Sequence, residues 1–400
     1  MDAFIFDLLA YDDNIERFRE GGAIPKLTKR YFDPVRAVRT YEEHLAAWSE
    51  LEELGFDGVA VNEHHGTPYG LMNSPNLLVA SIAQRTKKLK ILTYGNLLPI
   101  HDPLRLAEEI AMLDCLSNGR LIAGVARGAP REYRVYNVPA AESRARFEEC
   151  FDIMQKAWTE ESFSYEGKFH SYKDVAIWPR PIQQPHPPVW IPATGSKETI
   201  EWAAARNFGI TPGAMRMGTA REDIIRHYAK VQAQHGRKVT PQHFNLMIDC
   251  YVADSKAQAI KEYGAYFTYF WNTLIRYDHE SGDQQKGYYS SSAHQHLRSG
   301  TQGTLAVGSD KDRPLAPTGM TMESLARQAE GMAWGTPDEV VERIIEEAEE
   351  AGAHTALLVC NRGAVPQEMF LNQIRRIGKE VLPRLKAHKI SRVKFAEGVA

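Results

Sequence analysis

The sequence alternates short apolar runs with longer amphipathic segments along its whole length, and this rhythm restricts the folds that it can adopt. The apolar runs have the length of buried β-strands, and they fall at residues 3–9, 58–62, 89–94, 121–126, 188–193, 208–211, 244–252 and 355–359. Apolar residues at helical spacing predict helices between them, at 40–54, 74–84, 103–116, 144–158, 196–206, 221–234, 256–270, 337–351 and 367–385. Strands that alternate with helices predict a parallel sheet covered by helices.

Two architectures contain such a sheet: a closed (β/α)8 barrel and a doubly wound open sheet. Eight strands favour the barrel, and no G-x-G-x-x-G follows the first strand, which argues against a dinucleotide-binding open sheet. We therefore predict an α/β protein, a (β/α)8 TIM barrel in a single domain over residues 1–400, with a tail at 386–400. A polar insertion at 273–320 interrupts the rhythm, and we expect it to act as an active-site lid. A solvated insertion without a role would have the same composition.

The composition argues against several classes of protein. The net charge is −3, whereas nucleic-acid and anionic-membrane partners need a concentrated basic face. No stretch approaches the ~20 apolar residues of a transmembrane helix, and the first residues do not have the pattern of a secretory signal. The four cysteines form no C-x-x-C pair, so we expect neither a zinc site nor disulfides, and the chain is predicted to be cytoplasmic.

Two histidines follow the second predicted strand, at the edge where barrel enzymes carry out their chemistry. The sequence there is Asn62-Glu63-His64-His65. Adjacent histidines point in roughly opposite directions in an extended chain, so they do not easily chelate one metal, and we expect no metal site. One imidazole at the barrel mouth, oriented by Glu63 or Asn62, suits acid–base catalysis near neutral pH. The alternative is a pair of histidines that only hydrogen-bond the loop.

Residues suited to binding phosphate follow the fourth and fifth predicted strands. Arg127 comes directly after the fourth, where a fixed guanidinium would be a good anion ligand, although arginines more often form surface ion pairs. Ser196 and Thr199 begin a helix whose free N–H groups would complete a phosphate site, but the same hydroxyls could simply cap that helix. After the third strand, Gly95 either admits a flat ligand or marks a bulge. These residues fit FMN and, equally, a sugar phosphate.

Several motifs occur in an order that is typical of one family. They include E-H-H-G-T-P-Y-G at 63–70, L-D-x-x-S-x-G-R at 113–120, R-G at 127–128, R-V-Y at 134–136, E-W-A-A at 201–204 and G-T-P-x-E at 335–339. Over nearly its whole length the chain resembles the bacterial luciferase-like, flavin-dependent monooxygenases, and most of all the catalytic α subunit of bacterial luciferase. The resemblance implies a (β/α)8 barrel that binds reduced FMN and adds O2 to it, forming a flavin C4a-peroxide.

The resemblance also implies roles for individual residues. His64 matches the catalytic base of the family, and Tyr94-Gly95 matches a non-proline cis peptide beneath the isoalloxazine ring. Arg127, Ser196 and Thr199 match the phosphate contacts. Ala126 replaces a cysteine that lies near the flavin in luciferase, which makes room there. The expected cofactor-binding residues are Tyr94, Gly95, Ala126, Arg127, Tyr133, Thr194, Gly195, Ser196 and Thr199.

We therefore predict a two-component, FMNH2-dependent monooxygenase that oxidises a small organic substrate, either at a carbonyl in a Baeyer–Villiger reaction or by hydroxylation. A separate flavin reductase is expected to supply FMNH2, because the sequence has no nicotinamide-binding fingerprint. The family resemblance suggests a dimer that is joined through the helices after the early strands. Two alternatives stay open: an F420-dependent hydride-transfer oxidoreductase of the same fold, and a non-catalytic flavin-binding partner subunit.

Overall fold

The computed structural model describes residues 1–11, 13–15, 31–68, 70–193, 196–213, 220–274 and 320–398. Almost all of the predicted lid, 273–320, therefore lies outside the described residues. Two of the expected cofactor-binding residues, Thr194 and Gly195, lie outside them as well.

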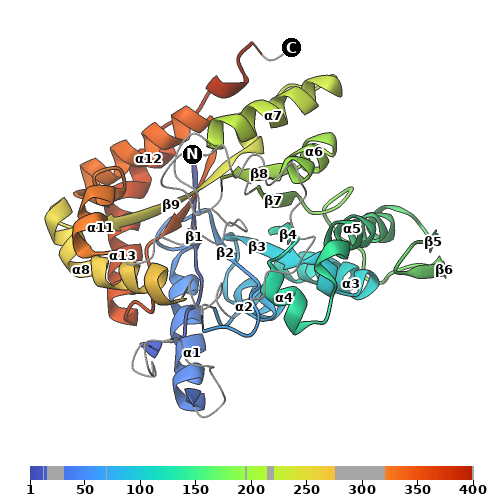
Figure 1. Cartoon of the computed structure of the whole chain (residues 1–400), viewed down its shortest axis with the longest axis horizontal. Helices are drawn as coiled ribbons and strands as arrows, with labels where there is room; N and C mark the ends of the chain where they lie inside the picture. The colour runs from blue at the N-terminus through green and yellow to red at the C-terminus, as the bar shows by residue number, and fades with distance from the viewer. Residues whose placement is uncertain are drawn as a thin grey trace.

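Parallel strands form a curled sheet at the centre of the molecule (Figure 1). Eight of them follow one another around it in chain order: β1 (Asp2–Phe6), β2 (Gly58–Val61), β3 (Lys90–Leu97), β4 (Leu121–Ala126), β7 (Val189–Ala193), β8 (Gly209–Pro212), β9 (Asn245–Val252) and β11 (Thr355–Val359). Strand β11 pairs with β1, and a parallel bridge between Ile210 and Phe244 joins β8 to the start of β9. The predicted (β/α)8 barrel is thus confirmed. A ninth strand, β10 (Ala333–Gly335), extends the sheet beside the end of β9.

Helices surround these strands (Figure 1). The main ones are α1 (Pro34–Glu50), α2 (Pro75–Arg85), α3 (Pro103–Ser117), α5 (Ser143–Thr159), α6 (Lys197–Ala205), α7 (Ala220–Gln234), α8 (Lys256–Tyr269), α12 (Pro337–Ala351) and α13 (Gln367–Arg376). Capping explains where several begin, since Asp33, Asp102 and Thr336 each accept hydrogen bonds from first-turn N–H groups. Helix α1 starts six residues before the predicted position 40, because Asp33 caps it and Pro34 suits its first turn. None of the described helices is long and apolar enough to cross a membrane.

Several shorter elements were not predicted. They are α4 (Pro130–Val135), the antiparallel hairpin of β5 (Phe163–Glu166) and β6 (Ser171–Val175), α11 (Met322–Ala329), the π-helical turn Phe270–Leu274 and a 3-10 turn at Lys394–Ala396 in the predicted tail. The helix predicted at 367–385 is present as α13, which continues through a π-helical turn at Ile377–Val381 into α14 (Leu382–Ala387). The hairpin lies beside α5 at the edge of the molecule (Figure 1). The carboxylate of Glu149 on α5 accepts hydrogen bonds from the backbone of Lys168, Phe169 and His170, which fixes the hairpin turn. A local apolar pattern cannot reveal such a tertiary anchor.

Two apolar cores hold the barrel together. One lies between the strands and the helices, and its largest buried side chains include Trp48 and Trp158. The other fills the barrel interior, where the Phe6 and Tyr94 rings meet edge to face with their centroids 6.0 Å apart. The Tyr94 hydroxyl bonds to Thr211 within this core. The barrel thus buries apolar surface on both sides of its sheet, as expected for parallel strands.

The close approach of β3 and β4 explains the glycine at position 95. A Cβ there would lie 2.8 Å from the backbone of Gly124 and Val125, and the register of the two strands shifts between Thr93 and Asn96. The bulge that was one of the two interpretations of Gly95 is therefore present. The Tyr94–Gly95 peptide bond is cis, which is the geometry that the family resemblance implied.

Candidate active site

His64 lies in the loop after β2 and is held by a carboxylate from α4. Its Nδ1 atom is 3.3 Å from Oε1 of Glu132, and its backbone oxygen accepts a hydrogen bond from Asn73. The side chain of His64 is 27% exposed, whereas that of Glu132 is 1% exposed. An accessible imidazole oriented by a buried carboxylate is the arrangement of a general acid or base.

Glu132 is ionised in this arrangement. Burial alone would raise the pKa of its carboxyl group, but the hydrogen bond with His64, the nearby positive charges and the Ala129 N–H together lower that pKa. One of those charges is Arg131, whose Nη2 lies 3.7 Å from Oε1 of Glu132. An ionised carboxylate can only accept a hydrogen bond, so it fixes the orientation of the His64 ring.

The sequence pointed to Glu63 or Asn62 as the group that orients His64, and the structure places Glu132 there instead. Asn62 donates to the backbone oxygen of Asp7 at 2.8 Å. Glu132 stands three residues after Ala129, whose N–H donates to its carboxylate at 2.7 Å, and Pro130 occupies the first turn. Proline followed by a glutamate at the third position is a helix-start pattern. That pattern could have revealed α4, though not its contact with His64.

Glu63 is instead the centre of a second, buried cluster. Its carboxylate accepts from the Leu97 N–H at 2.9 Å and lies 2.8 Å from Nε2 of His65 and 2.9 Å from Nε2 of His101. The other ring nitrogen of His65 is 3.1 Å from the Tyr136 hydroxyl. Burial would raise the pKa of Glu63, but these hydrogen bonds and the charge of His101 lower it to about 2. The two adjacent histidines thus have different surroundings, and only His64 faces solvent to an appreciable extent.

The Glu63 cluster predicts how stability depends on pH. The pKa of His101 is raised above its usual 6.5, because the hydrogen bond and charge of Glu63 outweigh the effect of burial. A raised folded-state pKa stabilises the protein below the unfolded pKa, and this contribution is lost as the pH rises through the raised value. We expect the free energy of unfolding to fall as the pH increases above 6.5, and His101→Asn to remove that dependence. Urea unfolding between pH 5.5 and 9 measures both.

The exposed His235 near the end of α7 offers a matched control. His235→Asn should retain the wild-type dependence on pH. The interpretation fails if the His101→Asn variant loses stability with rising pH as steeply as the wild type does.

A group of donors follows β4 and β7. Nη2 of Arg144, at the start of α5, lies 2.6 Å from Oγ1 of Thr199 and 3.4 Å from Oγ of Ser196. Ser196 occupies the N-cap position of α6, but its hydroxyl donates to Glu198 at 2.9 Å and makes no capping bond to the first turn. The alternative role of Ser196, helix capping, is thus met in position but not by its hydroxyl. The N-terminus of α6 therefore points its N–H groups towards this cluster without a side-chain cap.

Arg144 is the functional candidate that the sequence did not reveal. Its pKa is lowered, first by burial and then by the charge of Arg127, so the two guanidinium groups lie close enough to repel each other. Glu148 lies 3.6 Å from Nη1 of Arg144, and this nitrogen has no hydrogen-bond partner within the described part of the chain. Two neighbouring guanidinium groups beside hydroxyls and a helix N-terminus form a favourable seat for an anion. We call Arg127, Arg144, Ser196 and Thr199 the anion cluster.

The remaining expected cofactor residues support this region in different ways. Tyr133 is fully buried, and its hydroxyl donates to the backbone oxygen of Arg127. Ala126 ends β4 opposite Leu97. Asn96, next to the cis peptide, is 1% exposed, and neither polar atom of its amide has a partner among the residues described. A buried amide without partners would gain hydrogen bonds from a polar ligand.

Comparisons with known proteins identify the family of this chain. The family model described as luciferase-like monooxygenase matches residues 27–355. The segments that match this chain cover 51% of y4wF and 88% of y4vJ, two uncharacterized proteins of Sinorhizobium fredii. The oxygenase component of the flavin-dependent trigonelline monooxygenase of Acinetobacter baylyi is 25% identical over 60% of this chain and 68% of its own.

Solved structures show the same likeness. Monooxygenase RslO1 from Streptomyces bottropensis matches with a TM-score of 0.72 and 25% identity, over 96% of this chain and 99% of its own. The oxygenating constituent of 3,6-diketocamphane monooxygenase from Pseudomonas putida, in complex with FMN, has a TM-score of 0.66 and 20% identity, over 96% and 98%. An F420-dependent secondary alcohol dehydrogenase shares the fold at a TM-score of 0.61 and 15% identity, over 96% and 98%. The chain therefore belongs to the luciferase-like monooxygenase family.

Proposed function

We propose that this oxidoreductase is the oxygenase component of a two-component system, which uses FMNH2 and O2 to oxidise a small organic substrate. The observation that carries the proposal is the placement of two clusters at the same end of one barrel. The anion cluster follows β4 and β7, and the His64–Glu132 pair follows β2. A phosphorylated redox cofactor and a proton-transfer group would thus face the same space.

The residues present fit the phosphate of FMN. Arg144 brings a buried Nη1 atom that lacks a hydrogen-bond partner among the described residues, and Arg127 brings a second guanidinium. Ser196 and Thr199 add hydroxyls beside the N-terminus of α6. When bound, reduced FMN would supply the electrons that activate O2. The chain itself would anchor the phosphate, and His64 would accept or return a proton at the substrate while Glu132 orients its ring.

The proposal also implies two protein partners, a flavin reductase and a second subunit. The name of the Acinetobacter baylyi relative describes it as an oxygenase component, which supports a separate reductase as the source of FMNH2. Apolar side chains are exposed on the helices after the early strands: Leu77 on α2, Met112 and Leu116 on α3, and Val135 on α4. Exposed apolar surface of this kind supports a dimer that buries it.

One alternative keeps the fold and changes the chemistry. The F420-dependent alcohol dehydrogenase shares this barrel, so hydride transfer with F420 is the second candidate function. The third reading, a partner subunit without catalysis, is disfavoured by the His64–Glu132 pair, because a partially exposed imidazole on a buried carboxylate has no evident packing role.

Anaerobic titrations of the protein with FMNH2 and with reduced F420 distinguish these functions. We expect saturable binding of FMNH2 and, after mixing with 18O2 and a panel of aldehydes, ketones and aromatic substrates, one 18O atom in the oxidised product. Binding of reduced F420 without binding of FMNH2 would replace this proposal with the hydride-transfer candidate. Binding of FMNH2 without 18O in any product would favour the non-catalytic subunit.

A further inference from the structure

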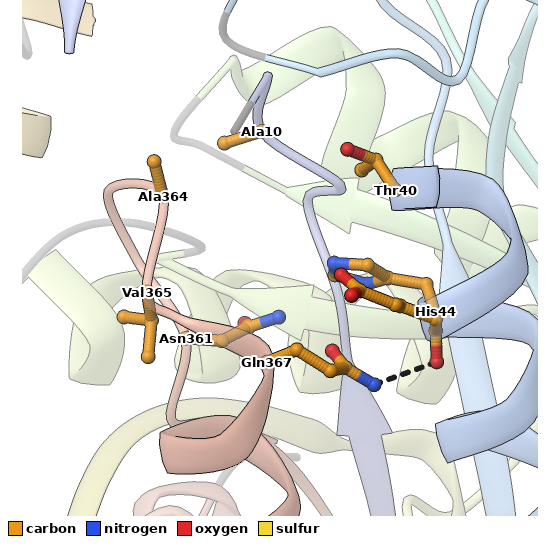
Figure 2. A pocket seen from close by; sticks show the side chains of 8 residues that line it. Ala10, Thr40, His44, Asn361, Ala364, Val365 and Gln367 are labelled. Carbon is orange, nitrogen blue, oxygen red and sulfur yellow. Dashed lines mark hydrogen bonds between the residues drawn. The ribbon is translucent and has the colours of Figure 1, made fainter. Parts of the chain in front are cut away.

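A polar pocket lies outside the two clusters described above. It opens between α1 and the loop that joins β11 to α13 (Figure 2). Its lining residues are Ala10, Thr40, Glu43, His44, Asn361, Ala364, Val365 and Gln367. None of these residues belongs to the His64–Glu132 pair or to the anion cluster. The pocket is therefore a separate candidate for binding a ligand.

The base of the pocket is built on the buried carboxylate of Asp7. Asp7 is 0% exposed and lies 2.6 Å from Nδ1 of His44, and it accepts hydrogen bonds from Trp48 at 2.8 Å and from Nδ2 of Asn361 at 2.8 Å. Burial would raise the pKa of Asp7, but the charge of His44 and these hydrogen bonds lower it. The carboxylate is thus an acceptor that fixes the donors around it.

The orientation of the two amide side chains in the pocket follows from their partners. The Nδ2 group of Asn361 donates a hydrogen bond to Asp7. The Nε2 group of Gln367 donates a hydrogen bond to the backbone oxygen of Glu43 at 2.7 Å, drawn as the dashed line in Figure 2. A carboxylate and a carbonyl only accept, so the nitrogen and oxygen positions of both amides are determined. The two amide oxygens, Oδ1 of Asn361 and Oε1 of Gln367, are buried and have no partner among the described residues.

Apart from His44, whose Nδ1 faces the Asp7 carboxylate at 2.6 Å, the other polar groups around the pocket also lack protons to offer. The hydroxyl of Thr40 donates its proton to the backbone oxygen of Arg36 at 2.9 Å, so its oxygen remains an acceptor towards the pocket. Glu43 contributes a carboxylate, and its pairing with Arg39 is long, at 3.8 Å, and exposed. No lysine or arginine lines the pocket, and the positive charge of His44 is balanced by the Asp7 carboxylate 2.6 Å from its Nδ1. Acceptors that are left unsatisfied are unfavourable, so an occupant that donates several hydrogen bonds would be stabilised here.

We propose that this pocket binds a small nitrogen cation, either ammonium or the primary ammonium end of an alkylamine. Such a group donates three or four N–H bonds, which matches the oxygens of Asn361, Gln367 and Thr40, and its charge suits the Glu43 carboxylate. Ala10, Ala364 and Val365 provide apolar walls for the carbon chain of an alkylamine. This inference does not depend on the proposed function.

Selective stabilisation by cations tests the proposal. Thermal unfolding of the whole protein is followed in ammonium, methylammonium, tetramethylammonium and sodium chloride at equal ionic strength. We expect ammonium and methylammonium to raise the melting temperature along a saturable curve, because a ligand that binds the folded state stabilises it. Tetramethylammonium, which has no N–H donor, and sodium should follow the common salt baseline. Equal shifts in all four salts would mean that the pocket holds only water, and would overturn the proposal.

Variants of Gln367 test whether the stabilising cation binds in this pocket. Gln367→Glu adds a negative charge next to the cation, and Gln367→Met removes the oxygen acceptor. We expect the apparent Kd for methylammonium to fall about tenfold in the first variant and to rise about tenfold in the second. Glu368→Gln, at an exposed position on the same helix, is the matched control and should behave as the wild type. Each Kd comes from a saturation curve, so it is independent of the starting stability of the variant. Unchanged Kd values in both Gln367 variants would place binding elsewhere and refute this site.

Discussion

Replacing His64 with alanine is expected to lower kcat by roughly 10²- to 10⁴-fold, the usual contribution of a general acid or base, while FMN affinity stays near that of the wild type. The imidazole is 27% exposed and held by the buried Glu132, but it belongs to the loop after β2, whereas the anion cluster follows β4 and β7. Removal of the ring should therefore affect proton transfer and spare the phosphate contacts. Steady-state turnover of an accepted substrate, together with a titration of flavin, measures the two effects separately.

His227 provides a closely matched control for this variant. It lies on α7, is 26% exposed and sits 3.1 Å from Glu201, so it is also a histidine paired with a carboxylate. His227→Ala should retain wild-type turnover. Glu132→Gln should lower kcat by less than His64→Ala, and the double variant should be no slower than His64→Ala alone, because Glu132 acts through the ring. Wild-type turnover of His64→Ala would remove its assigned role.

Replacing Arg144 with methionine is expected to weaken FMN binding about 100-fold, or ~2.7 kcal/mol, as for the loss of a charge-assisted hydrogen bond. The guanidinium is 23% exposed, contacts Thr199 at 2.6 Å and lies close to Arg127. Methionine keeps an apolar side chain similar to the methylene groups of arginine, so the substitution removes mainly the guanidinium group. Riboflavin lacks the phosphate, so its affinity should be unchanged, and the preference of the protein for FMN over riboflavin should shrink by the same factor.

Arg146 on the same helix separates a specific effect from a general loss of positive charge. Its guanidinium pairs with Glu142 at 2.9 Å and lies 4.2 Å from the ring centre of Phe169, so its own partners are already in place. Arg146→Met should bind FMN as the wild type does. Equal losses in the Arg144 and Arg146 variants would show that overall charge, and not an anion seat at Arg144, controls the affinity.

The sequence by itself determined the barrel. Buried strands and amphipathic helices each place their apolar residues at a characteristic spacing, and this spacing can be recognised without knowledge of distant contacts. The helix starts at Asp102 and Thr336 could be recognised for the same local reason, because a cap bonds to its own first turn. His64 and Arg127 were found through their positions after strands, since parallel strands bring their carboxyl ends to one edge.

Only the tertiary structure decided which groups act together. Glu132 meets His64 across 68 residues, and Arg144 meets Thr199 across 55. Asn361 reaches Asp7 across 354 residues, because the last barrel strand closes against the first. Closure of the barrel sets these distances, and burial then decides which charged groups need partners. The spacing of apolar residues shows which face of a helix or strand is buried. It carries no information about which polar side chains will meet across the folded chain.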